Sequence, residues 1–380
     1  MIIVMILMFF DTASSQTERG SDRSIFRGAY SATIGGMQQQ WVLTDKNGNE
    51  LGTILQRTAP VTVSVPLANR LLLTVANSGV ISEYDTASST NIVDTRVSLS
   101  YVFPGEKLWL TGGASLPTGK TQLDPAELNM TSLLGQTVFG YKAPTFGQGY
   151  TGNISLVYAG SLTRRMVLGI GLSYFYKGPF SPLAGSASEY DAGDEISLNT
   201  GFDYITYSKT ARFSVDITAT YFLQDRLSNT AGTFEPVFAS GPRVIANLIY
   251  SLRMESWNHM LLLRTRYRLQ NNFISSNKKY DASTQVEGQY SVGTMLLNGV
   301  YASFLGEGKY YTPDQVPSGV TYIETGNAVI GAAGADFTLT TVGWMMPTLG
   351  VRYARGTATI LGVEYDASGL DASLSLRFSF

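Results

Sequence analysis

The C-terminal stretch Asp371–Phe380, DASLSLRFSF, decides the fold class. From Ala372 onward every second residue is apolar, and the residues between are serine or arginine. Successive side chains of a strand point to opposite faces, so the stretch predicts a strand with one apolar and one polar face. A strand of about ten residues with this alternation suits a membrane β-barrel, because one face meets lipid and the other meets the lumen.

The same alternation recurs along the chain, in segments of about ten to fifteen residues, whereas strands of a soluble β-sandwich usually have about five or six. The repeating segments include residues 61–67, 96–103, 195–204, 212–221, 244–252 and 261–269. Short turns are predicted near residues 67–70, 104–107, 161–165, 208–210, 255–258 and 341–343. Long polar loops are predicted near residues 85–92, 118–148, 178–192, 226–238, 272–281, 305–322 and 357–367. Short turns at one end and long loops at the other are typical of bacterial barrels, whose chain end lies on the periplasmic, short-turn side.

Apolar residues are dispersed rather than collected in long runs. Hydrophobic residues make up 44% of the chain and charged residues 15%, yet the longest apolar run is Ile2–Phe10. A membrane-spanning helix needs about 20 consecutive apolar residues, and only helices and closed barrels satisfy their backbone hydrogen bonds inside lipid. We therefore predict an all-β fold, a transmembrane antiparallel up-and-down β-barrel of about 14 to 16 strands in the cell outer membrane.

The chain is predicted to divide into three parts. Residues 1–15 have the features of a cleaved signal peptide, because Ile2–Phe10 has a suitable length and Ala13–Ser15 offers small residues for cleavage, although no basic residue precedes the run. An ordinary buried strand or helix is the alternative. Residues 16–36 form an N-terminal segment, either periplasmic or a partial plug, and residues 37–380 form the barrel.

Two stretches carry resemblances to known proteins. Leu376, Phe378 and Phe380 resemble the terminal signature of Gram-negative outer-membrane barrels, which implies recognition by the barrel assembly machinery and a surrounding of outer-membrane lipid and lipopolysaccharide. Gly112–Lys120, GGASLPTGK, resembles strand ends of the outer-membrane transporters of the phenol-degradation pathway family, distant relatives of fatty-acid transporter barrels. This second resemblance implies passive uptake of small aromatic or apolar molecules.

The polar faces of the strands carry many charges. Arg264, Arg266 and Arg268 stand at alternate positions and so point the same way. A basic ladder lining a pore would favour anions; the alternative is an interior network in which arginines pair with carboxylates and fill a narrow barrel. The candidates for lining the lumen are Arg96, Arg212, Arg243, Arg253, Arg264, Arg266, Arg268, Arg352, Arg377, Glu195, Asp203, Asp216, Glu287 and Asp371. The longest loop, Thr118–Gln148, is interpreted as a surface loop in preference to an inward constriction.

No constellation of residues indicates catalysis or a cofactor. The only histidine, His259, follows a predicted short turn and has no serine two residues away, so a lipid-active enzyme of the serine–histidine type is a remote alternative. The absence of cysteine excludes thiolate metal sites, and a net charge of −2 argues against a nucleic-acid partner. The sequence favours a passive channel or transporter for small solutes, either small aromatic or apolar molecules or anions. A structural barrel with a closed lumen, in a homo-oligomer or an envelope complex, is the alternative.

Overall fold

The computed structural model describes Phe26 and residues 30–379, except for residues 136, 142–143, 145–146, 230–231, 275–276, 319–320, 341–342 and 361–362. The predicted signal peptide, residues 1–15, lies outside the described residues, as does Phe380.

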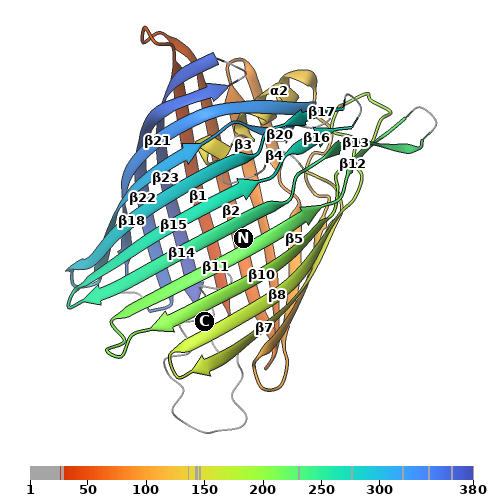
Figure 1. Cartoon of the computed structure of the whole chain (residues 1–380). Helices are drawn as coiled ribbons and strands as arrows, with labels where there is room; N and C mark the ends of the chain where they lie inside the picture. Colours follow the sequence, from red (N-terminus) through yellow and green to blue (C-terminus); the bar gives the residue numbers. More distant parts are fainter. Residues whose placement is uncertain are drawn as a thin grey trace.

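Sixteen long antiparallel strands close into a barrel in the described part of the chain (Figure 1). The strands pair in chain order, and β1 pairs with β23 to close the ring, which leaves the barrel without a free edge. The barrel strands are β1 (Ser31–Thr44), β2 (Glu50–Ala68), β3 (Leu71–Tyr84), β5 (Thr95–Val102), β6 (Leu108–Leu116), β7 (Thr151–Thr163), β8 (Met166–Lys177), β10 (Glu195–Ile205), β11 (Ala211–Phe222), β14 (Arg243–Met254), β15 (Trp257–Arg268), β18 (Ser283–Leu297), β19 (Val300–Tyr311), β21 (Thr321–Leu339), β22 (Met345–Ile360) and β23 (Val363–Ser379). The predicted fold class is confirmed, and its first strand begins at Ser31, six residues before the predicted barrel boundary at residue 37.

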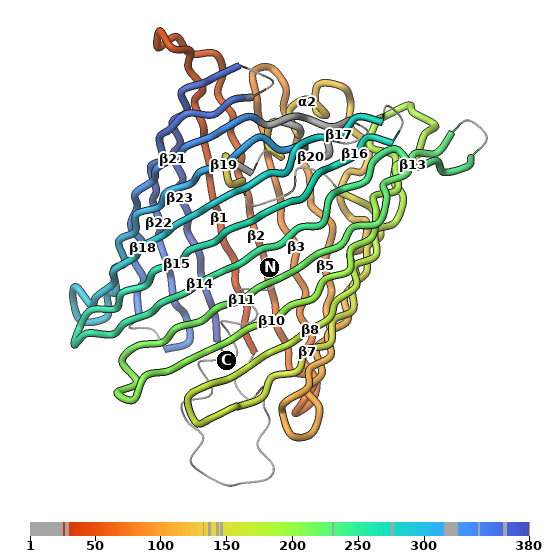
Figure 2. Tube along the Cα trace, in the orientation of Figure 1, coloured from red at the N-terminus to blue at the C-terminus, as the bar shows by residue number. Residues whose placement is uncertain are grey.

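The predicted short turns that fall within the described residues lie at one end of the barrel, which we call the short-turn end. The opposite, long-loop end carries a second sheet that extends away from the barrel wall (Figure 2). Its strands are β9 (Tyr190–Asp191), β12 (Asp225–Ser228), β13 (Phe234–Ala239), β16 (Asn271–Phe273) and β17 (Lys278–Tyr280). Three of the predicted long loops, near residues 178–192, 226–238 and 272–281, therefore contain paired strands.

Three other predicted long loops are largely strand. Residues 87–92 form β4 (Ala87–Ile92), residues 314–318 form β20 (Asp314–Ser318), and residues 357–367 are mostly the ends of β22 and β23. The prediction was wrong because these segments are polar and rich in small residues. A neighbouring strand supplies backbone hydrogen bonds whatever the side chains are, so pairing continues past the apolar part of each strand.

The strands present opposite chemistry on their two faces. On β15, Leu261, Leu263 and Tyr267 are between 42% and 43% exposed on the outer face, and the alternate residues point inward. Exposed tyrosines and tryptophans lie toward the strand ends, as Tyr176, Trp257 and Trp344 do, and aromatic girdles are typical of the two membrane interfaces. In the described part of the chain, no helix is long and apolar enough to cross a membrane.

Candidate functional site

The long connection between β6 and β7 enters the barrel interior. It carries α2 (Pro125–Leu134) and the short 3₁₀ helix η2 (Thr137–Phe139), and we call residues 117–150 the constriction loop. Its buried residues Met130, Leu134, Val138 and Phe139 pack in one cluster with inward-facing wall residues. The wall residues are Trp41, Leu43, Ile54, Tyr311, Ala328, Ile330, Ala358 and Ala367, from β1, β2, β19, β21, β22 and β23.

The predicted surface position of Thr118–Gln148 is therefore wrong. The physical reason is that this part of the inner wall is apolar and must be covered. Trp41 and Ile54 stand opposite each other on the inner face and are 3% and 0% exposed. The presence of Trp41, Leu43 and Ile54 at lumen-facing positions was the signal in the sequence for an inward loop.

Hydrogen bonds fix the innermost part of the constriction loop to the wall. Trp41 Nε1 donates to the Phe139 carbonyl at 3.0 Å, and the Tyr141 hydroxyl donates to the Ile54 carbonyl at 3.0 Å. Gln39 Nε2 donates to the Gly140 carbonyl at 3.3 Å. Two of these bonds are accepted by loop carbonyls and the third is donated by a loop side chain, so the loop is held by its main chain as well as by its side chains.

One buried carboxylate holds both ends of the constriction loop. Asp94 Oδ1 accepts a hydrogen bond from Gly119 N at 3.0 Å, and its Oδ2 accepts one from Gln148 N at 2.7 Å. A Cβ atom on Gly147 would lie 2.7 Å from Asp94 Oδ1, and one on Gly119 would lie 2.8 Å from the Ile92 carbonyl oxygen. Only glycine allows the two ends to approach the carboxylate this closely.

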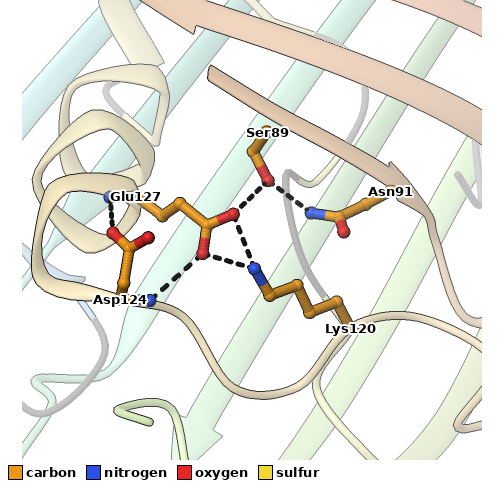
Figure 3. Close-up of polar contacts among 5 residues, drawn as sticks. All are labelled: Ser89, Asn91, Lys120, Asp124 and Glu127. Carbon is orange, nitrogen blue, oxygen red and sulfur yellow. Dashed lines mark hydrogen bonds and ion pairs between the residues drawn. The ribbon is translucent and has the colours of Figure 1, made fainter. Parts of the chain in front are cut away.

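A second carboxylate anchors the start of α2, as Figure 3 shows. Lys120 Nζ lies 2.6 Å and 2.5 Å from the two carboxylate oxygens of Glu127, and Ser89 Oγ donates to Glu127 Oε1 at 3.0 Å. The Asp124 and Glu127 side chains each accept the other residue's backbone N–H, which forms a capping box. Burial raises the pKa of Glu127, but the hydrogen bonds from Lys120, Asp124 and Ser89 outweigh it and hold that pKa below its ordinary value.

Strand register places every predicted lumen residue on the inner face. Arg212 contacts Asp203 at 2.9 Å, Arg264 contacts Glu287 at 3.8 Å, and Arg352 contacts Asp336 at 3.9 Å. The remaining members of the set take inner-face positions in the strand pairings, namely Arg96, Arg243, Arg253, Arg266, Arg268, Arg377, Glu195, Asp216 and Asp371. The role of the set in lining a pore stays a prediction.

The ion pairs differ in part from those expected. An interior network suggested that Arg212 and Asp216 of β11 would meet Glu195 and Asp203 of β10. Arg212 does contact Asp203, whereas Glu195 contacts Lys177 of β8 at 2.7 Å and Arg243 of β14 at 3.7 Å. Sequence reasoning missed Lys177, and the inner-face pair of Glu307 and Lys309 at 3.1 Å. The available signal was that Lys177 shares one row of β8 with glycine and serine, and that Glu307 and Lys309 alternate with glycine on β19.

The arginines of β14 and β15 form a basic patch on the inner wall. Arg268 stands opposite Arg243, Arg266 opposite Gln285, and Arg264 opposite Glu287. Arg264 Nε donates to Asn247 Oδ1 at 2.9 Å, Arg266 Nη1 donates to Gln285 Oε1 at 2.9 Å, and Arg268 Nη1 donates to Asp314 Oδ1 at 3.3 Å. We call Arg243, Arg264, Arg266 and Arg268 the basic wall.

His259 lies apart from the barrel interior. It is the third residue of β15, at the short-turn end, and its Nδ1 lies 2.7 Å from the hydroxyl of Tyr290. Both side chains belong to the outer row of their strands. Among the described residues, no group of three or more histidine, aspartate or glutamate side chains is arranged to hold a metal ion.

The two described residues of the terminal signature, Leu376 and Phe378, lie on the outer face of β23. Leu376 stands opposite Ile34 of β1, and the Phe378 ring stacks on Trp344 with 5.9 Å between ring centroids. Recognition of these residues by assembly machinery stays a prediction.

No protein-family model matches the chain, and no curated protein matches it. The resemblance of Gly112–Lys120 to a transporter family therefore stays a prediction. A mutant of the TodX monoaromatic hydrocarbon channel matches with a TM-score of 0.46 and 9% identity, over 92% of this chain and 90% of that one. OprB from Pseudomonas putida matches with a TM-score of 0.44 and 9% identity, over 93% and 95% of the two chains. An anion-selective porin from Comamonas acidovorans matches with a TM-score of 0.43 and 11% identity, over 92% and 98%.

Similarities at this level carry no argument about what crosses this barrel. The assignment rests on the molecule itself, whose closed strand ladder leaves no edge, whose outer face is apolar and whose inner face is polar. The chain is an outer-membrane β-barrel of sixteen strands with a loop inserted into its interior.

Proposed function

We propose that the protein is a passive channel for small solutes and that it favours anions. The observation that carries this proposal is the exposure of charged side chains inside the barrel. Away from the constriction loop, the side chains of Arg212 and Arg264 are 27% and 29% exposed. Next to that loop, Gln39 and Gln56 are 1% and 0% exposed. A charge network that filled the barrel would bury its members in the same way, so the exposed arginines support a lumen that holds water.

The constriction loop and the basic wall belong to different parts of the inner surface. The loop packs on β1, β2, β19, β21, β22 and β23, whereas the basic wall belongs to β14 and β15. A barrel of sixteen strands is wide enough for a water-filled channel unless it is plugged. A loop on one side narrows such a channel. The basic wall is separated from β19 by β18 alone, and Tyr311 under the loop donates to Glu287, which contacts Arg264. Arginines beside the narrowed passage raise the local concentration of anions.

Single-channel recording in planar lipid bilayers tests this proposal. The purified protein is expected to give a steady conductance. Under a salt gradient, the sign of the reversal potential is expected to show that anions pass more easily than cations. The double variant Arg264→Ala, Arg266→Ala should reduce that preference without unfolding the barrel. The matched control Arg57→Ala removes an arginine from the outer face, where it pairs with Glu83, and should leave selectivity unchanged. A folded but silent barrel would contradict the proposal and favour a structural barrel with a closed lumen.

A further inference from the structure

Two phenylalanines interrupt the polar inner face beside the basic wall. Phe175 of β8 and Phe222 of β11 stand on either side of Glu195, each directly opposite it in the strand pairing. Both lie in the inner row, and neither is buried. Aromatic side chains that face a water-filled lumen keep apolar area in contact with water, which an apolar solute would remove.

Two cations lie near the Phe222 ring. The Arg243 guanidinium carbon lies 5.0 Å from the ring centroid, and Lys177 Nζ lies 6.0 Å from it. The side chains of Arg243 and Lys177 are 23% and 22% exposed, so solvent reaches both. One patch of wall therefore offers an apolar ring and two cations to the same solute. Because Glu195 contacts both cations, the patch keeps one net positive charge.

Among the described residues of this region, the cations outnumber the carboxylates that contact them. Lys177 and the basic wall supply five positive charges, and Glu195, Glu287 and Asp314 supply three negative charges, which leaves an excess of two. Arg243 and Arg268 also stand directly opposite each other, and like charges at that position repel. An added anion would lower this repulsion, and guanidinium groups bind carboxylates well because two N–H donors match two oxygens.

We propose that Phe175, Phe222, Lys177 and Arg243 form a binding site for organic anions that carry a carboxylate on an apolar ring or short chain. This inference rests on the proposed channel function and narrows its solutes. The carboxylate contacts Arg243 and Lys177, with Arg266 and Arg268 adding to the field, and the apolar body packs on the phenylalanine rings. Chloride or acetate can use only the cations, and a neutral aromatic molecule can use only the rings.

Block of the chloride current by added solutes tests the site. Benzoate, acetate and benzyl alcohol are compared at equal concentrations in planar bilayers. Benzoate is expected to reach half-block at a concentration about 5-fold lower than acetate, because it adds aromatic packing to charge pairing. Benzyl alcohol should block more weakly than benzoate.

Variants separate the two parts of the site. Phe222→Ala should bring the half-block concentration of benzoate up to that of acetate, and Arg243→Gln should weaken block by both. Tyr221→Ala is the matched control, because this neighbouring aromatic side chain is on the outer face and is 57% exposed; its benzoate-to-acetate ratio should equal that of the unaltered protein. Phe175→Ala gives a second test of the ring contribution if Phe222→Ala does not fold.

The failure of this inference can be told apart from that of the channel function. Equal block by benzoate and acetate in an open, conducting pore would overturn the site and leave the channel standing. A barrel that conducts nothing would overturn the channel. In that case calorimetric titration with benzoate decides the site by itself: binding that Phe222→Ala weakens supports it, and no binding overturns it.

Discussion

Removal of the Asp94 carboxylate should loosen the constriction loop while leaving the barrel intact. Asp94→Ala deletes the acceptors of Gly119 N and Gln148 N, at 3.0 Å and 2.7 Å. Hydrogen bonds to a charged group are worth about 1.5–3 kcal/mol each, so the seated loop loses roughly 3–6 kcal/mol. The ladder between β6 and β7 ends at the pair of Ser115 and Thr151, outside the described part of the constriction loop, so the barrel should keep its thermal stability.

The innermost part of the loop should nevertheless stay on the wall. Phe139 and Met130 are 2% and 0% exposed, and full burial of such side chains contributes about 1.5–3 kcal/mol each. Asp94→Ala is therefore expected to produce fluctuation between two conductance levels rather than a permanently wider channel. Both levels can be read in single-channel recordings, with the melting temperature measured by circular dichroism alongside.

Two further variants sharpen this prediction. Asp94→Asn keeps one carbonyl acceptor and should fluctuate less than Asp94→Ala. Glu83→Ala is the matched control, because it removes an exposed carboxylate that pairs with Arg57 at 3.1 Å, and an exposed pair contributes only about 0–1 kcal/mol. If Asp94→Ala conducts with a single level identical to that of the unaltered protein, the carboxylate does not hold the loop and the reasoning is refuted.

The remaining predictions concern the same loop. Because the pKa of Glu127 is lowered, the contacts of its carboxylate with Lys120 and Ser89 are fully present above the ordinary pKa of 4.5 and are lost as pH falls through the lowered pKa. Current noise should therefore rise in that acid range. Glu127→Gln should show the same noise already at neutral pH. Trp41→Ala removes a ring that contacts Phe139 at 5.3 Å between centroids and should cost about 3–5 kcal/mol of loop packing. Limited proteolysis should then cut residues 117–150 faster than in the unaltered protein. Equal protection of the two proteins would contradict this prediction. Gly147→Ala should reproduce the fluctuation of Asp94→Ala. Gly112→Ala is the control, because a Cβ there meets nothing within 4 Å, and it should conduct normally. If both glycine variants behave alike, the close approach of Gly147 to Asp94 is not the cause.

The sequence by itself determined the class of fold and the face of each strand. Alternation has a strict period of two, so once Leu261 and Leu263 are assigned to lipid, Arg264 and Arg266 must point inward. The ends of strands at short turns were also readable, because turns such as 104–107 need residues that tolerate unusual backbone angles, as Gly105 does at φ 87°.

Only the tertiary structure decided what fills the barrel and which charges meet. The apolar wall beneath the constriction loop is assembled from Trp41 and Ile54 near one end of the chain and Tyr311 and Ile330 near the other. These two groups come together only when β1 pairs with β23. Asp94 reaches Gly119 and Gln148 across 25 and 54 positions, a separation that carries no local signal. Glu195 contacts Lys177 and Arg243 because the registers of β8 and β14 bring them within reach, and register is a property of the closed sheet, not of any single strand.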